Sequence, residues 1–326
     1  MSKPKVYVTR LIPDDGMKLL YEKCEVTLNP HDRVATREEL LAGVKGQDAM
    51  LCLLTDKIDA EIMDANPNLK IIANYAVGYN NIDVAAATQR GIPVSNTPGV
   101  LTDTTADLAW TLIMATARRA VEGDKFTRAG KFKGWGPMLL LGQDVHHKTL
   151  GIVGFGRIGQ AVAKRATGFD MKILYYDKFK MPEVAAKFGA EYCELDELLQ
   201  RADIITLHCD LNESTFHLIG EREFGMMKKT AYLINTSRGP VVDEKALVKA
   251  LQNNMIAGAG LDVYEDEPAL APGLAELDNA VLLPHIASAT RETRGAMARI
   301  AAENVLAALE GRKPPTIVNP EVWKGN

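Results

Sequence analysis

The sequence predicts an α/β protein with two doubly wound domains, each built on a parallel sheet. Three observations support this fold class. The 326 residues are too many for one ordinary hydrophobic core, which favours two domains of roughly 100 to 200 residues. Short apolar runs alternate with amphipathic segments, as in successive β-α-β units. A glycine-rich turn also joins an expected strand to an expected helix.

The first domain is predicted over residues 1–99 and 286–326. Its expected strands are four short apolar runs: Lys5–Thr9, Ala49–Leu54, Lys70–Asn74 and Ile92–Ser95. The expected helices are amphipathic segments around residues 14–24, 36–42, 59–65 and 83–89. This alternation is typical of a parallel sheet that is covered on both faces. The amphipathic segment Thr290–Glu310 is expected to return to this domain, which makes the domain discontinuous.

The turn Tyr75–Asn80 follows one of these expected strands and contains Gly78. A glycine at this place lets backbone N–H groups approach an anion closely. A tight turn without a ligand is an equally good interpretation of these residues by themselves.

The second domain is predicted over residues 100–285, because the strand and helix pattern breaks at Asn96–Gly99. Polar residues at 102–104 can cap a long helix, which is expected to continue past Arg119. The basic run after it contains acids and is interpreted as a solvated helix face. An aromatic and aliphatic cluster then follows at 133–141, in an expected loop. Such clusters are often subunit contacts or pocket lids.

The clearest motif of the chain lies within Thr149–Asp177. The apolar run Leu150–Val153 suits a buried strand, and a G-x-G-x-x-G pattern follows it with Gly154, Gly156 and Gly159. These glycines permit a tight turn, a close approach to a pyrophosphate, and close packing of the next helix on the strand. The pyrophosphate would meet the positive end of that helix. A Rossmann domain that binds a dinucleotide is therefore predicted.

Asp177 decides which dinucleotide is expected. It follows a second apolar run, Lys172–Tyr176, at the end of the expected second strand. A carboxylate there accepts hydrogen bonds from the adenosine ribose hydroxyls and repels a 2′-phosphate. NAD(H) is therefore preferred, while Lys178 and Lys180 leave NADP(H) as the less favoured alternative because they can attract that phosphate.

Further strands are expected at 203–207, 230–235, 256–261 and 280–283. Ligands of open parallel sheets bind beyond the carboxyl ends of the strands, so the residues that follow these strands share one crevice. Three of those residues suit hydride chemistry on a small 2-oxo acid: Arg238, Glu267 and His285.

Each of the three side chains has a distinct expected role. Arg238 can grip a carboxylate with two hydrogen bonds and polarise the neighbouring carbonyl. His285 can give a proton to the carbonyl oxygen as hydride arrives at carbon. Glu267, if it is bonded to the other ring nitrogen, would orient His285 and favour its protonated form. Taken singly, a charged residue such as Arg238 is more commonly a surface charge, and a histidine is more commonly a core residue with its hydrogen bonds satisfied.

Composition argues against several other classes of protein. The net charge of −4 gives no electrostatic footprint for nucleic acid. No apolar segment is long enough to suggest a membrane span, and the first residues lack the apolar core of a signal peptide, so a cytoplasmic location is expected. The four cysteines have no C-x-x-C spacing, which favours reduced thiols and no metal site.

Four segments together resemble the signature blocks of the D-isomer-specific 2-hydroxyacid dehydrogenases. They are residues 154–159, 235–243, 260–268 and 283–287, which match in the family's order. Within the family the chain is most similar to the glyoxylate and hydroxypyruvate reductases, through residues 96–102, 115–119 and the loop around Trp135. The resemblance covers essentially the whole chain and implies a Rossmann domain together with a flavodoxin-like substrate domain.

The resemblance also implies roles for particular residues. Main-chain N–H groups of Val77 and Gly78 would hold the substrate carboxylate, with Leu54 nearby, and Arg238 and His285 would act on the same substrate. The implied cofactor residues are the three motif glycines with Thr104, Arg157, Ile158, Asp177, Cys209, Thr236, Arg238, Asp262 and His285. A homodimer is implied as well, in which the loop around Trp135 reaches towards the active site of the partner.

The expected activity is thus an NAD(H)-dependent reduction of glyoxylate or hydroxypyruvate to the D-2-hydroxy acid. Formate is disfavoured as a substrate because formate dehydrogenases of the family pair the histidine with glutamine, whereas this chain has Glu267. A phosphite dehydrogenase of the same family is the first alternative, since it shares the three reacting residues. An NAD-sensing scaffold with negligible turnover is the second alternative.

Overall fold

The structure is a computed structural model that describes residues 2–323 of the chain. It divides into two compact units. The first unit is formed by the chain up to Leu101 and from Ala289 onward, and the second unit by Thr102–Ser288. The boundaries expected after residues 99 and 285 lie close to these two crossings.

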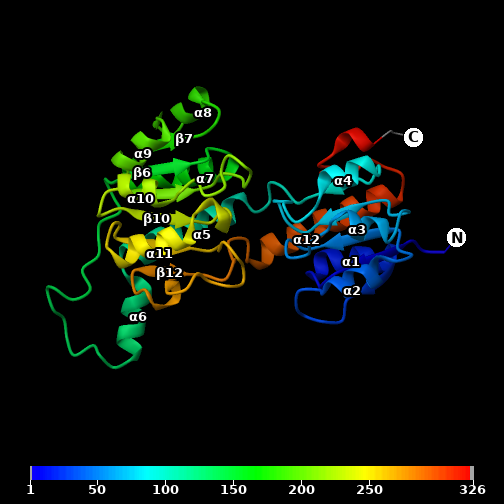
Figure 1. Cartoon of the computed structure of the whole chain (residues 1–326), viewed down its shortest axis with the longest axis horizontal. Helices are drawn as coiled ribbons and strands as arrows, with labels where there is room; N and C mark the ends of the chain where they lie inside the picture. The colour runs from blue at the N-terminus through cyan, green and yellow to red at the C-terminus, as the bar shows by residue number, and fades with distance from the viewer. Residues whose placement is uncertain (1, 324–326) are drawn as a thin grey trace. The chain divides into compact units, whose positions relative to one another are not determined.

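The first unit is built on a parallel five-stranded sheet with the strand order β2-β1-β3-β4-β5 (Figure 1). The strands are β1 (Lys5–Val8), β2 (Glu25–Leu28), β3 (Ala49–Cys52), β4 (Ile72–Asn74) and β5 (Val94–Ser95). Every pair of neighbours is parallel. This is the strand order of flavodoxin-like domains, so the doubly wound fold predicted for this part is confirmed.

Helices cover both faces of this sheet. One face packs against α1 (Asp14–Lys23) and α12 (Arg291–Leu309), and the other against α2 (Arg37–Val44), α3 (Ala60–Asp64) and α4 (Val84–Gln89). Successive side chains of a strand point to opposite faces of the sheet. Val6 and Val8 of β1 therefore lie in the core under α1 and α12, and Tyr7 lies in the core on the other face. Because α12 lies in the first of these two cores, the C-terminal segment completes this unit.

The second unit contains a parallel seven-stranded sheet with the strand order β12-β11-β10-β9-β6-β7-β8. The strands are β6 (Thr149–Val153), β7 (Lys172–Tyr176), β8 (Ala190–Tyr192), β9 (Ile204–Leu207), β10 (Tyr232–Asn235), β11 (Gly258–Leu261) and β12 (Ala280–Leu282). Chain order reverses between β6 and β9, which is the topological switch point of a Rossmann fold. Crevices at such points are the usual ligand sites.

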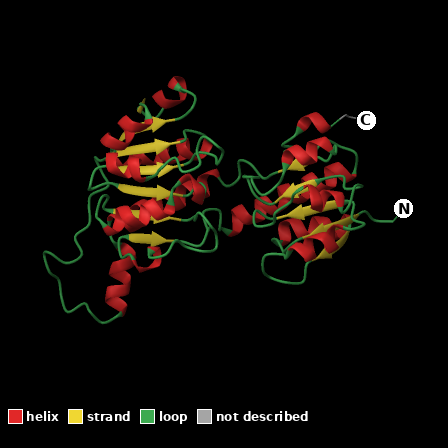
Figure 2. Cartoon of the chain, viewed as in Figure 1, coloured by secondary structure: helices red, strands yellow, loops and turns green. Residues whose placement is uncertain are grey.

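Two separate cores flank the seven-stranded sheet. Figure 2 distinguishes its strands, in yellow, from the helices, in red, that cover them. One core holds residues of α5 (Thr102–Ala117) and α7 (Arg157–Ala166), and the other holds residues of α9 (Leu195–Arg201), α10 (Glu221–Met226) and α11 (Glu244–Gln252). The remaining helices are α6 (Ala120–Arg128) and α8 (Pro182–Ala186), with 3-10 turns η1 (Thr167–Phe169), η2 (Gly239–Val241), η3 (Leu274–Glu276) and, in the first unit, η4 (Pro320–Val322).

Three local features differ from the sequence prediction. Strands β2 and β8 were not expected, because their residues are exposed or half-buried and show no continuous apolar run. The prediction that one helix continues past Arg119 was also wrong. Arg119 adopts a left-handed conformation with φ 52°, which ends α5 at Ala117 and starts the separate helix α6. No glycine or proline marks this break in the sequence.

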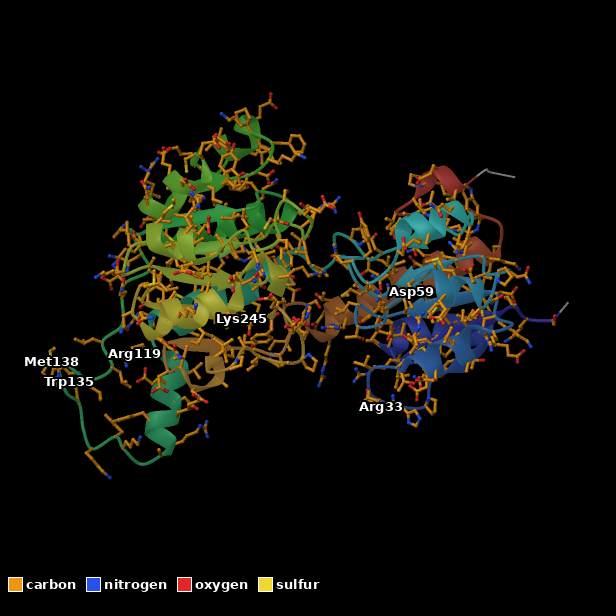
Figure 3. All side chains as sticks on the ribbon, viewed as in Figure 1. Arg33, Asp59, Arg119, Trp135, Met138 and Lys245 are labelled. Carbon is orange, nitrogen blue, oxygen red and sulfur yellow. The ribbon has the colours of Figure 1, made fainter. Side chains whose placement is uncertain are left out.

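A long extended segment follows α6 and extends away from the body of its unit (Figure 1). We call residues 129–142 the arm. Both Trp135 and Met138 lie at its far end (Figure 3) and are 85% and 77% exposed. Within residues 2–323, no helix has the length and apolar character that crossing a bilayer requires.

Close packing of α1 on α12 depends on Gly16, and this dependence can be tested. A Cβ atom at Gly16 would lie 2.4 Å from the carbonyl oxygen of Ala298. We expect Gly16→Ala to lower the free energy of unfolding by about 1–3 kcal/mol, because the backbone of α12 must move away. Chemical denaturation measures this change. Gly225→Ala in α10 is the control, since open space surrounds it, and an unchanged Gly16→Ala midpoint would contradict the packing argument.

Candidate active site

The candidate active site is built at the carboxyl ends of strands in the second unit. Arg238 follows β10, Glu267 lies in the loop after β11, and His285 follows β12. These three strands are neighbours in the sheet. The expectation that their carboxyl ends share one edge therefore holds for the segments that carry all three residues.

Glu267 and His285 form a direct pair. The Nδ1 atom of His285 lies 2.9 Å from Oε2 of Glu267, and their side chains are 26% and 31% exposed. Burial by itself would raise the pKa of the Glu267 carboxyl. The hydrogen bond with His285, the charges of His285 and Arg238, and the N–H of Tyr264 outweigh burial, so the pKa lies below its usual value. The carboxylate is therefore the form present near neutral pH.

The backbone of His285 is held from both sides. Its φ of 55° is in the left-handed region, which is costly for a residue with a side chain. Before it, the Leu283 carbonyl accepts a 2.8 Å hydrogen bond from the Tyr264 hydroxyl. After it, the N–H groups of Ile286 and Ala287 both donate to the buried carboxylate of Asp262 at 2.8 Å. These bonds stabilise the unusual conformation that presents the imidazole.

Burial raises the pKa of the Asp262 carboxyl, and the two backbone N–H donors partly offset this effect. Asp262 was expected to contact the cofactor. In the structure its two carboxylate oxygens accept the bonds that fix the chain after His285. This positioning contact was not predicted, because it joins two segments that are far apart along the chain.

Arg238 is presented by a tight turn that Asn235 organises. The Asn235 side chain accepts bonds from the N–H and hydroxyl of Ser237 and donates to the Arg238 carbonyl at 3.0 Å. The guanidinium donates to the Ser237 carbonyl at 2.7 Å. Burial lowers the pKa of Arg238, opposed by the charges of Glu267 and Asp210. An arginine remains charged under these conditions, so a half-buried cation lies at this edge.

Gly239 allows the Arg238 turn to meet the Glu267 loop. A Cβ atom at this position would lie 1.7 Å from the Tyr264 carbonyl oxygen and 2.5 Å from the Glu265 nitrogen. Tyr264 in turn donates its N–H to Glu267 at 3.1 Å. Tyr264 was not predicted, although it contacts the segments of Arg238, Glu267 and His285. Its place between Asp262 and Glu267 was the available signal.

A second network anchors the same loop from the side of α11. Glu244 is buried, and its carboxylate accepts hydrogen bonds of 2.7 Å from the N–H groups of Glu265 and Ala271. The Glu265 carboxylate accepts from the Glu244 N–H and pairs with Nε2 of His217 at 2.9 Å. The loop that carries Glu267 is thus held at both ends.

The glycine motif forms a turn that suits a dinucleotide. Gly154 has φ 90°, and a Cβ atom there would lie 2.5 Å from the Cys209 nitrogen. At Gly156 a Cβ would meet nothing within 4 Å, which leaves space above the start of α7. The first backbone N–H groups of a helix, here at Arg157 and Ile158, lack helical acceptors and favour an anion.

Asp177 contacts this turn directly. One carboxylate oxygen accepts from the Phe155 N–H at 2.7 Å, and the other from the Phe179 N–H at 3.1 Å. These bonds fix the carboxylate beside the glycine turn at the end of β7. Each oxygen keeps a further lone pair that can accept from a ribose hydroxyl.

Other predicted cofactor residues also lie at this edge. Cys209 follows β9, and Thr236 follows β10, where its buried hydroxyl has no partner among the described residues. Burial raises the pKa of the Cys209 thiol to about 12, so it is not a thiolate at neutral pH. His208 precedes Cys209 and was not predicted. Burial lowers its pKa to about 3, and its Nδ1 is likewise buried without a partner.

Leu54, Val77 and Gly78 belong to the first unit, together with the turn after β4. Thr104 lies in the first turn of α5, in the second unit. The contacts of these four residues with substrate or cofactor stay predictions.

Comparison with known proteins gives a consistent result. The family model described as D-isomer specific 2-hydroxyacid dehydrogenase, NAD binding domain, matches residues 110–287. A glyoxylate reductase from Thermococcus gammatolerans is 52% identical over 326 residues, which cover 99% of this chain and 98% of that protein. A glyoxylate reductase from Thermofilum pendens is 54% identical, with 99% and 97% covered.

Solved structures are similar over the same extent. The crystal structure of a glyoxylate reductase from Paecilomyes thermophila has a TM-score of 0.87 at 36% identity and covers 98% of this chain and 100% of its own. An NADPH-dependent glyoxylate/hydroxypyruvate reductase from Sinorhizobium meliloti has a TM-score of 0.86 at 33% identity, with 97% of both chains covered. Fold, motif order and whole-length identity thus agree, and the chain belongs to the D-isomer-specific 2-hydroxyacid dehydrogenase family, whose members are oxidoreductases.

Proposed function

We propose that this protein reduces small 2-oxo acids with NADH, glyoxylate first and hydroxypyruvate second, to the D-2-hydroxy acid. The observation that carries the proposal is the 2.9 Å pair of His285 and Glu267 on the same sheet edge as Arg238. The glycine motif of a dinucleotide site lies at the carboxyl end of another strand of that sheet. The relatives at 52% and 54% identity are glyoxylate reductases, which favours this substrate.

Several features fit a nicotinamide dinucleotide. They are the space above Gly156, the free first turn of α7, and the buried unpartnered atoms of Thr236 and His208. Arg157 and Ile158 would hold the pyrophosphate through backbone N–H groups, and Asp177 would hold the adenosine ribose. When bound, NADH supplies a hydride from its nicotinamide ring. Asp177 favours NADH, although the Sinorhizobium meliloti relative is NADPH-dependent.

The side chains then divide the remaining chemistry. Arg238 would grip the substrate carboxylate and polarise the adjacent carbonyl. Because Nδ1 of His285 faces Glu267, Nε2 is the ring nitrogen left to donate a proton to the carbonyl oxygen. After this transfer the ring would keep the proton on Nδ1, where it is hydrogen-bonded to the Glu267 carboxylate. In the direction of oxidation, the same Nε2 would take the proton back.

The proposal is tested by following NADH oxidation with glyoxylate, hydroxypyruvate, pyruvate and no acid, and then by repeating the series with NADPH. Turnover of glyoxylate or hydroxypyruvate, faster with NADH, is the expected result. A separate series supplies phosphite and NAD. Reduction of NAD by phosphite without turnover of any 2-oxo acid would assign the phosphite alternative, and NADH binding without any turnover would assign the scaffold.

Glu267→Gln should separate charge from shape at the proton donor. The amide keeps the size of the side chain but removes the carboxylate charge that pairs with Nδ1 of His285. We expect kcat for the reduction of glyoxylate to fall by about tenfold or more, while the NADH dissociation constant stays near that of wild type. Steady-state kinetics and fluorescence titration measure these two quantities, with the exposed Glu276→Gln as control. An unchanged kcat would contradict the role given to Glu267.

Asp177→Ala should change the choice of cofactor. It removes the ribose acceptor and the charge that repels a 2′-phosphate, so we expect weaker NADH binding and a smaller ratio between NADH and NADPH affinities. Fluorescence titration with both cofactors measures the ratio. Glu183→Ala, at an exposed site on α8, is the control. An unchanged ratio would refute the ribose role.

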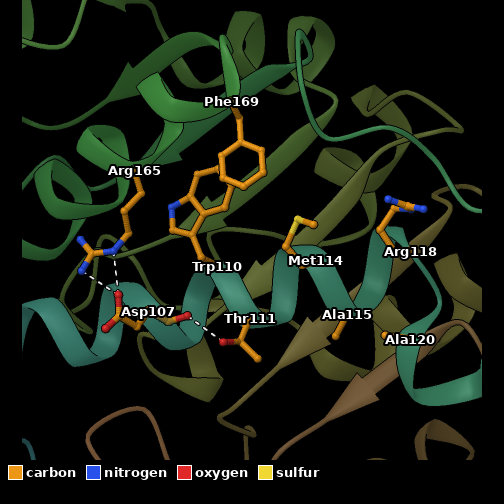
Figure 4. Close-up of a pocket in the computed structure, with 9 residues that line it drawn as sticks. All are labelled: Asp107, Trp110, Thr111, Met114, Ala115, Arg118, Ala120, Arg165 and Phe169. Atoms are coloured by element: carbon orange, nitrogen blue, oxygen red, sulfur yellow. Dashed lines mark hydrogen bonds and ion pairs between the residues drawn. The ribbon is translucent and has the colours of Figure 1, made fainter. Parts of the chain in front are cut away.

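We also infer a homodimer formed through the arm. Four large apolar side chains of the arm are more than half exposed: Phe132, Trp135, Met138 and Leu141. The same unit offers a hollow of about 780 Å³ along α5, where Trp110 stacks on Phe169 with 4.6 Å between ring centroids (Figure 4). Two copies related by a twofold axis would each supply an arm and an apolar α5 face, so that the apolar side chains of both surfaces are removed from water.

A double change of Trp135 and Met138 to Asp should dissociate this dimer, because two charges cannot be desolvated in an apolar contact. Light scattering after gel filtration gives the mass, which we expect to fall from twice the chain mass to 35.6 kDa. Val34→Asp, another exposed apolar site, is the control. A monomeric wild type, or an unaffected double variant, would contradict the proposed interface. The approach of Trp135 to the partner's active site and the cytoplasmic location stay predictions.

A further inference from the structure

The turn after β4 directs backbone carbonyls and N–H groups to opposite sides. The Val77 carbonyl accepts a 2.8 Å hydrogen bond from the Asn96 amide, and the Gly78 carbonyl accepts a 2.9 Å bond from the Asn74 amide. In a trans peptide the N–H points away from the carbonyl of the same unit. These two bonds therefore fix the direction of the Gly78 and Tyr79 N–H groups.

These N–H groups are free to meet a ligand. Within the described part of the first unit, the N–H groups of Val77, Gly78 and Tyr79 donate no hydrogen bond. Val77 and Gly78 are half-buried, and Tyr79 is exposed. Successive backbone N–H groups in a turn form a concavity that suits an anion. We call residues 77–79 the N–H cradle.

Asn74 supports the cradle from the interior. It ends β4, is fully buried, and uses its amide nitrogen for the Gly78 carbonyl and for Oδ1 of Asn81 at 3.2 Å. Its oxygen accepts from the Cys52 thiol at 3.6 Å. A buried amide is costly unless it is bonded, and here both ends of the side chain have partners. A carboxylate at this position would lack both N–H donors.

Asn81 connects the cradle to a second loop. Its amide nitrogen donates to the carbonyls of Leu53 and Asp56, at 3.0 and 3.1 Å. Asp56 is itself buried, where its carboxylate accepts from the Thr9 hydroxyl and the Leu53 N–H. Leu54, which was expected near the substrate, thus lies in a loop that Asn81 joins by hydrogen bonds to Asn74 and so to the cradle.

We propose that Asn74, together with Asn96, is a positioning residue that sets the affinity for the substrate carboxylate. Asn74 acts by holding the Gly78 carbonyl inward, so that the N–H groups of the cradle face the anion. The ligand class is a small carboxylate, and this inference rests on the proposed reduction of 2-oxo acids. His285 lies in the other unit, so we expect a change in the orientation of these amides to alter substrate affinity more than the chemical step.

Asn74→Asp tests the inference. The variant keeps the size of the side chain but sets acceptor oxygens against the Gly78 carbonyl, which must then turn. We expect KM for glyoxylate to rise about tenfold to hundredfold. We expect kcat and the NADH dissociation constant to stay within about twofold of wild type. Asn96→Ala, at a half-buried site, should raise KM in the same way and keeps the test valid if Asn74→Asp does not fold.

Asn66→Asp is a matched control in the same unit. Asn66 is also buried, and its amide donates to the carbonyls of Val44 and Gln47 at 2.8 and 2.7 Å. It should lose a comparable amount of stability without a change in KM. The inference fails if the Asn74 and Asn96 variants keep the wild-type KM, or if Asn66→Asp raises KM equally. A wild type that reduces no 2-oxo acid would overturn the proposed function as well, which distinguishes the two failures.

Discussion

The contact between Gly239 and the Tyr264 carbonyl is the constraint on which the candidate active site depends. No side chain fits there, since a Cβ atom would overlap the carbonyl oxygen at 1.7 Å. The contact sets the Arg238 turn against the loop of Glu267. The N–H and hydroxyl of Tyr264 then hold Glu267 and the Leu283 carbonyl. One residue thus determines the spacing of the segments that carry the cation, the carboxylate and the imidazole.

Buried amides perform a similar task in both units. Asn235 and Asn74 each end a parallel strand and donate to a backbone carbonyl three or four residues later. The result is a turn whose backbone direction is set by a side chain in the core. In the second unit this presents a guanidinium, and in the first it orients N–H groups. Both arrangements place a positive group or dipole at the carboxyl edge of a sheet, where an anionic substrate binds most favourably.

The sequence predicted the parts of the fold that apolar pattern determines. Strands buried on both faces, such as Leu150–Val153, are continuous apolar runs, and the glycine motif marks the turn after them. Strands β2 and β8 escaped because they are exposed in part, and the break at Arg119 has no local signal. Arg238, Glu267 and His285 were predicted to lie near one another because parallel strands end at one edge, and the segments that carry them do follow neighbouring strands. The roles of Tyr264 and Glu244 depend on contacts between segments that are far apart along the chain. The role of Asn74 depends on the backbone conformation of the turn after β4. A sequence pattern contains neither.

Transfer of the hydride itself is the most direct test of this account. The enzyme is incubated with glyoxylate and NADH that carries deuterium at C4 of the nicotinamide, in ordinary water, and the glycolate is examined by mass spectrometry. Two samples of NADH are compared, each with deuterium on one face of the nicotinamide ring at C4. The account predicts that one of the two samples transfers its deuterium to C2 of glycolate, while the new hydroxyl proton comes from solvent through His285. Glycolate without label from either face would show that no hydride passes from cofactor to substrate, and would contradict the mechanism built on Arg238, Glu267 and His285.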